Sequence, residues 1–191
     1  AITLIRNHIK SYPNECVDLL SPYVGASDEW NTEILHIIWD RVLSTDRRIF
    51  DLYMRLLADG TLTNEGPKDF WMSIHDLPKK QPDWAAEALG KHLRLAMANY
   101  RSDDSRWHTH HGEHLVLEIA ENAPDAFLDA VLPVFLDVVQ RTAQNRDGCL
   151  MIDRVWSGRV YRDECLSLEA ALLQGIEGAL KSLASTSISD F

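Results

Sequence analysis

The chain lacks any long apolar run and any N-terminal targeting pattern. No stretch of about 18 consecutive apolar residues is present, and a helix that crosses a membrane needs roughly that length. The N-terminus also lacks the succession of basic, apolar and small residues that marks a secretory signal peptide. We therefore expect a protein without membrane segments, and we expect it in the cytoplasm.

Cysteine and basic residues are scarce as well. The three cysteines, Cys16, Cys149 and Cys165, are far apart and form no C-x-x-C pair, so neither a disulfide framework nor a thiolate zinc site is predicted. The 19 lysines and arginines are outnumbered by 29 acidic residues, and the formal net charge is -10. This balance argues against a broad nucleic-acid surface, because phosphate binding requires clustered basic residues. No G-x-x-x-x-G-K-[ST] loop is present, and no cofactor is expected.

What the chain has instead is helical periodicity. The clearest example is the segment 110–141, which is typical of two amphipathic helices folded back on each other across a short break. Apolar residues in its second half recur at helical spacing, at Phe127, Val131, Val134, Phe135 and Val138. So wide an apolar face requires neighbours on more than one side, and we expect these helices to lie inside a stack. Pro133 falls within the pattern and should bend its helix.

Similar patterns cover most of the chain, and no strand is predicted. Besides the pair within 110–141, the predicted helices span residues 2–11, 13–24, 28–43, 46–59, 69–77, 82–100 and 166–183. The second helices of successive pairs begin near Pro13, Asp46, Pro82 and Pro124, at intervals of roughly 33, 36 and 42 residues, which is typical of two-helix repeats. Three of these starts combine a proline with a following short polar residue, which favours a sharp turn into a new helix.

This irregular period resembles the HEAT and armadillo family of α-helical repeats, over about 165 residues. The resemblance implies a right-handed α-solenoid of about four antiparallel helix pairs plus a closing C-terminal helix, with one face that binds another macromolecule. We accordingly expect an all-α fold in which residues 1–191 form a single repeat domain. Because the chain starts with Ala1 and opens directly on a helical pattern, we expect it to be a fragment of a larger protein.

Three segments are similar to helical regions of the large bacterial signal-transducing ATPases of the STAND type. They are residues 127–134 (FLDAVLPV), 153–156 (DRVW) and 168–180. Those ATPases carry their nucleotide-binding motif in a separate domain, and this chain has no such motif. The resemblance implies the sensor or regulatory part of a larger protein.

The candidate partner-binding residues belong to a long loop predicted at 144–165. Arginines alternate there with aromatic residues, and these residue types dominate binding hot spots. The residues singled out are Arg154, Trp156, Arg159, Tyr161 and Arg162. Two alternatives stay open: the apolar residues of the loop fold back to cap the last repeat, or the arginines of 145–162 bind nucleic acid locally.

A second candidate site is the H-x-x-E-H pattern of His110, Glu113 and His114. In the inverted zincin pattern, two histidines one helical turn apart bind zinc and the glutamate activates water. A zinc-dependent hydrolase is therefore an alternative function, and adventitious or structural metal binding by the histidine-rich segment 108–114 is another. Gly112 weakens the helix that would align the ligands, and no third carboxylate ligand can be assigned downstream. We interpret the segment as a polar loop that enters a helix.

The remaining chemistry-bearing residues are interpreted as packing elements. His36 and His92 lie on or beside apolar helix faces, where core or boundary histidines are expected. Gly175 and Gly178 lie on nearly the same face of the last helix, where they would allow close contact with a neighbour. Four helical tryptophans are assigned to the core or to contacts between repeats: Trp30, Trp39, Trp71 and Trp84. The sequence thus favours a non-catalytic interaction or scaffold module whose partner is a protein or another domain of the parent chain.

Overall fold

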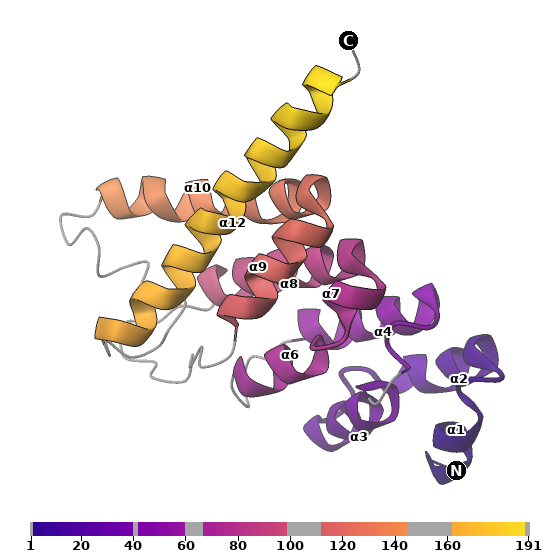
Figure 1. Ribbon diagram of the computed structural model, residues 1–191. Coiled ribbons are helices and arrows are strands. Elements are labelled where there is room, and N and C mark those ends of the chain that lie inside the picture. Colours follow the sequence, from indigo (N-terminus) through magenta and orange to yellow (C-terminus); the bar gives the residue numbers. More distant parts are fainter. Residues whose placement is uncertain (1, 40–41, 60–66, 99–111, 145–161, 190–191) are drawn as a thin grey trace. The chain divides into compact units, whose positions relative to one another are not determined.

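The computed structural model describes residues 2–39, 42–59, 67–98, 112–144 and 162–189 (Figure 1). The regular elements of these segments are all helical, and none of the segments contains a strand. The predicted all-α class is therefore confirmed. The chain divides into two compact units, unit 1 from Ala1 to Asn64 and unit 2 from Glu65 to Phe191, where the sequence predicts one domain. Across the described segments, no helix combines the length and apolar character that spanning a membrane requires.

Unit 1 is built from two helix pairs. The first pair is α1 (Ile2–His8) and α2 (Pro13–Leu20), and α2 continues into a 3₁₀ turn, η1 (Ser21–Tyr23). The second pair is α3 (Asp28–Trp39) and α4 (Arg47–Ala58). The helices of each pair pack on each other, while α1 also packs on α3 and α2 packs on α4.

Proline and glycine determine where α2 ends. Pro22 has no N–H to donate to the carbonyl of Asp18, so the α-helix stops at Leu20, although the sequence predicts it to about residue 24. Gly25 then turns the chain with a φ of 80°, a left-handed conformation that glycine adopts without strain. The predicted end of this helix near residue 24 thus coincides with the turn at Gly25, but the α-helical hydrogen-bonding pattern ends earlier, at Leu20.

The start of α4 agrees with the sequence. The side chain of Asp46 accepts a 2.8 Å hydrogen bond from the backbone N–H of Arg48 and so caps the helix at its predicted start. The end of α3 differs, because the α-helix extends to Trp39 rather than to residue 43. Residues 42–45 form a turn instead, in which the Thr45 hydroxyl donates to the carbonyl of Val42 at 2.6 Å.

A polar contact lies at the edge of the apolar core of unit 1. The buried apolar side chains of the two longer helices are Ile34, Leu35, Ile37, Ile38, Ile49, Phe50, Leu52, Tyr53, Leu56 and Leu57. Among them Asn31 is 1% exposed, and its Nδ2 donates to Oδ2 of Asp59 at 2.8 Å. Its Oδ1 accepts from the backbone N–H of Gly25, also at 2.8 Å. A buried amide is destabilising unless it is hydrogen-bonded. These two bonds meet that requirement, and they also link α3 to the turn at Gly25 and to the end of α4.

Unit 2 begins with two short helices, α6 (Pro67–Ser73) and α7 (Leu77–Lys80), followed by α8 (Pro82–Ala98). Next come α9 (Glu113–Asn122) and α10 (Pro124–Gln144), which the single residue Ala123 separates, and α12 (Arg162–Ser189) is the last helix. α7 packs on α8 and α9, and α8 packs on α9 and α10. α12 packs on both α9 and α10, and in Figure 1 it crosses α10.

Two of the helices predicted in unit 2 have the wrong bounds. The sequence predicts one helix over 69–77, but α6 ends at Ser73 and a new helix starts at Leu77. Pro78 explains the break, because it cannot donate to the carbonyl of Ile74 and therefore belongs in the first turn of a helix. The last helix is longer at both ends than the predicted 166–183.

The helices of unit 2 approach one another closely at two glycines. A Cβ at Gly90 of α8 would lie 2.6 Å from the backbone oxygen of Ala130 and 2.9 Å from its Cβ, so a larger residue does not fit between α8 and α10. A Cβ at Gly175 of α12 would lie 3.0 Å from Cζ of Phe127 and 3.1 Å from Cβ of Ala120. The predicted close contact is thus confirmed for Gly175. It is wrong for Gly178, where a Cβ would have no described atom within 4 Å.

Candidate interaction surface

The predicted partner-binding residues are described only at their C-terminal edge. Outside the described residues lie Arg154, Trp156, Arg159 and Tyr161. Arg162 is the first residue of α12, and the segment predicted as a loop at 144–165 has helical residues at both of its ends.

The histidine-rich segment is described from residue 112 onward. Outside the described residues lie His108, His110 and His111. Glu113 and His114 occupy the first turn of α9, where His114 is exposed. Gly112 precedes α9 rather than weakening a helix, and a Cβ there would lie 2.6 Å from Cζ2 of Trp71. Within the segments that the structure describes, no three or more His, Cys, Asp or Glu side chains are grouped so that they could hold a metal ion.

A buried cluster of three rings joins α6 to α8. The ring of His92 stacks on that of Phe70 with centroids 3.8 Å apart and an interplanar angle of 4°. Trp71 meets His92 edge-on at 5.8 Å and Phe70 edge-on at 5.0 Å. Burial lowers the pKa of His92 from 6.5 to about 3, so the imidazole is neutral in the folded protein at pH 7. The core role predicted for His92 is therefore confirmed, whereas His36 is exposed on α3.

The four helical tryptophans differ in burial. Trp71 is 3% exposed and belongs to the core, as predicted. Trp30, Trp39 and Trp84 are only partly buried. The ring of Trp30 stacks on that of Tyr23 at 4.3 Å with an interplanar angle of 24°, and this pair forms an aromatic surface at the end of η1.

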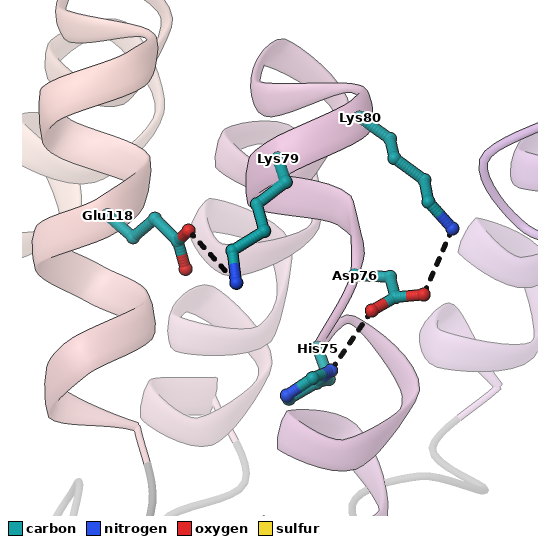
Figure 2. A network of polar contacts seen from close by, with 5 residues as sticks. All are labelled: His75, Asp76, Lys79, Lys80 and Glu118. Carbon is teal, nitrogen blue, oxygen red and sulfur yellow. Dashed lines mark hydrogen bonds and ion pairs between the residues drawn. The ribbon is translucent and has the colours of Figure 1, made fainter.

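A network of charged side chains holds α7 in place on the surface of unit 2 (Figure 2). Asp76 Oδ2 accepts a 3.0 Å hydrogen bond from Nζ of Lys80, and its Oδ1 lies 3.2 Å from Nδ1 of His75. Both contacts lower the pKa of the Asp76 carboxyl, and the hydrogen bond from Lys80 has the larger effect. Lys79 reaches in the other direction, and its Nζ lies 3.7 Å from Oε1 of Glu118 on α9. Exposed pairs of this kind stabilise by at most about 1 kcal/mol each, so we assign them to the positioning of α7.

The outer face of α12 carries exposed leucines. Its inner face is buried at Ala171, Leu172, Gly175, Ile176 and Ala179. On the other side, Leu173 is 48% exposed and Leu180 is 52% exposed. They belong to a set of five exposed residues, spaced three and four apart, which we call the outer seam: Ala170, Leu173, Glu177, Leu180 and Ala184. The sequence analysis missed this surface, although its three-and-four spacing is visible in residues 170–184.

Comparison of the chain with models of protein families, with curated proteins and with solved structures gives no significant match. On the described residues, the outer seam combines exposed leucines and alanines at regular three-and-four spacing.

Proposed function

We propose that this chain is a non-catalytic helical-repeat module that binds a protein partner. The order in which helices pack is the observation that carries the proposal. In unit 1, α1 packs on α3 and α2 packs on α4, while in unit 2, α7 packs on α9 and α8 packs on α10. First helices thus contact first helices and second helices contact second helices, as expected of two-helix repeats that stack in series. We also propose that these repeats form a right-handed, HEAT-like superhelix.

The last helix supports the same interpretation. α12 packs on α9 and α10, as the next first helix of a series would pack on the preceding pair. The terminal element of a soluble repeat array needs a polar outer face. The outer seam exposes two leucines instead, which supports contact with a partner protein or with another domain of a longer parent chain.

Affinity capture with the full chain tests this function. The immobilised chain is incubated with a cell extract, and the retained proteins are identified by mass spectrometry. A Trp156→Ala/Arg159→Ala variant is compared with Met72→Ala, whose parent side chain is 49% exposed on α6 and belongs neither to the seam nor to the predicted loop. We expect the double variant to lose the retained partner while its circular-dichroism melt stays unchanged, because Arg and Trp dominate binding hot spots.

Two outcomes of this capture experiment contradict the proposal. Capture that survives the double variant removes the predicted loop as the binding site. A wild-type chain that retains no more protein than a blank resin contradicts the binding function itself. Loss of capture in Met72→Ala as well would show that the effect is not specific to the loop.

A further inference from the structure

The outer seam has the spacing of a two-helix coiled coil. Its five residues recur at steps of three, four, three and four, which is the seven-residue repeat that keeps one stripe of a helix against a single partner helix. The buried face of α12 lies on the other side of the helix and already contacts α9 and α10. The seam is therefore a second, independent packing face, and its geometry fits one more helix.

The C-terminal end of α12 also extends beyond the part of the helix that is buried against α9 and α10. No residue from Leu180 to Thr186 is buried, although the helix continues to Ser189. In Figure 1 this end extends past α9 and α10. The hydroxyls of Ser185 and Thr186 donate to the carbonyls four residues earlier, at 2.9 and 3.0 Å, and such residues are weak helix formers. The two helical turns from Leu180 to Thr186, in which no residue is buried, are marginal alone in water, so a neighbouring helix would stabilise this end.

The charges on the seam indicate what this neighbour is. The whole chain carries a formal net charge of -10, which opposes contact between two copies over most of the surface. On the seam, however, Glu177 accepts a 2.6 Å hydrogen bond from Nζ of Lys181, so that the local charge is balanced. From Ser182 to Ser189 the sequence contains no charged residue. This stretch of α12 therefore adds no charge repulsion between two copies.

We propose that the outer seam pairs with the outer seam of a second copy of this chain in an antiparallel, two-fold arrangement. The antiparallel register that places Leu173 opposite Ala184 of the second copy matches a large side chain with a small one at both ends of the paired segment, residues 173–184. The same register places Glu177 beside Lys181 of the other copy. A parallel pair would instead bring the two Glu177 carboxylates to the same level, where like charges repel. The proposal rests on the proposed function, since it names the partner of one of its surfaces.

The dimer is expected to be weak. The seam from Ala170 to Ala184 is about 21 Å long at 1.5 Å per residue, and a single helix pair of that length buries less than the roughly 800 Å² per partner of a standard interface. We therefore expect association to depend on protein concentration in the micromolar range or above. A closed two-fold pair does not grow into a filament, because each copy uses its seam once.

Sedimentation velocity of the full chain over a range from about 5 to 500 μM tests the proposal. The wild-type chain should shift from the monomer mass toward twice that mass, and Leu180→Glu should raise the dissociation constant more than about tenfold, because each two-fold interface loses two leucines. Leu136→Glu is the matched control, since Leu136 is 55% exposed on α10 and lies off the seam. It should leave the dimer unchanged. A wild-type chain that stays monomeric throughout overturns the proposal, as does equal loss of dimer in both variants.

Disulfide trapping tests the register separately. We expect Leu173→Cys and Ala184→Cys chains, when mixed and oxidised, to form a disulfide that joins the two substituted positions. Leu173→Cys alone should not cross-link, because in this register the two equivalent positions are about 16 Å apart along the helix axis, well beyond the roughly 7 Å between Cα atoms that a disulfide allows. Efficient cross-linking of Leu173→Cys alone would contradict the antiparallel register.

The two proposals can fail independently. A chain that is monomeric at every concentration but loses partner capture in the Trp156→Ala/Arg159→Ala variant contradicts the seam proposal and leaves the binding function intact. A chain that dimerises through the seam and captures no other protein supports the seam proposal, and in that case the binding function is limited to self-association.

Discussion

Unit 1 and unit 2 pack their helices in the same order, yet they fill the space between the helices with different residues. The core of unit 1 contains large side chains such as Phe50 and Tyr53, both 0% exposed. In unit 2, the contact between α8 and α10 is made at Gly90, and α12 meets its neighbours at Gly175. Unit 1 also buries an amide, Asn31, within a hydrogen-bonded turn, whereas unit 2 buries a neutral imidazole, His92, in a ring stack.

This comparison shows that one packing order tolerates two kinds of helix contact. Large side chains hold helices apart and make a core sensitive to lost volume. Glycine at a helix contact lets backbones approach and makes the contact sensitive to added volume. The core around Phe50 and Tyr53 should therefore be sensitive to truncation, whereas the helix contacts at Gly90 and Gly175 should be sensitive to enlargement.

The largest expected effect is the removal of a ring from the core of unit 1. Phe50→Ala should lower the free energy of unfolding of unit 1 by about 3–5 kcal/mol, because a wholly buried Phe leaves a cavity. Native-state hydrogen exchange should show faster exchange in α2, α3 and α4, with α8 to α10 little changed. Phe127→Ala is the reciprocal variant in unit 2, since Phe127 is also 0% exposed. Equal loss of protection in both units after Phe50→Ala would show that they are not separate cooperative units.

The next effect depends on pH and distinguishes the imidazole of unit 2 from the amide of unit 1. The pKa of His92 is lowered from 6.5 to about 3 in the folded state, so between these values the unfolded chain binds more protons than the folded chain. The free energy of unfolding of unit 2 should therefore fall as the pH falls below about 6.5, by about 2 kcal/mol at pH 5 relative to pH 7. Urea denaturation of the wild type and of His92→Phe across this range measures the difference. The same pH dependence in both proteins would contradict the assignment.

The third prediction adds one methyl group at each of two glycines. Gly90→Ala should destabilise unit 2 by about 1–3 kcal/mol, because the new Cβ would lie 2.6 Å from the backbone oxygen of Ala130. Gly178→Ala makes the same chemical change on α12, where the added methyl would have open space around it. It should stabilise by about 0.5–1 kcal/mol, since alanine is the better helix former. Thermal melts of the two variants should thus shift in opposite directions. Destabilisation by Gly178→Ala would mean that its face is covered in solution.

The sequence predicts the elements that depend on local chemistry. Pro13, Pro82 and Pro124 each begin a helix in the structure, and Asp46 caps the start of α4. These signals succeed because they act on the backbone within one helical turn. Pro78 carries the same kind of signal, but the apolar pattern around Phe70, Trp71 and Ile74 conceals it and suggests one continuous helix.

Contacts between helices are harder to predict. Gly175 and Gly178 have nearly the same position on the helical wheel, yet only Gly175 meets another helix, because α9 and α10 cover only one side of α12. Which side is covered depends on the positions of α9 and α10, and no property of α12 alone determines them. For the same reason the seam leucines, Leu173 and Leu180, are indistinguishable in sequence from the buried Leu172. The loop residues proposed for partner binding, Trp156 and Arg159 among them, stay a prediction.

Serial packing within unit 2 can be measured most directly with distances between spin labels. Labels at Lys79 on α7, Glu118 on α9 and Gln174 on α12, in a chain whose three native cysteines are replaced by alanine, give three pairwise distances by electron–electron double resonance. If the helices form a row, the distance from 79 to 174 should exceed each of the other two by about one helix spacing, 8–10 Å. Three similar distances would mean that α7, α9 and α12 surround a common centre, and that result would contradict the serial arrangement.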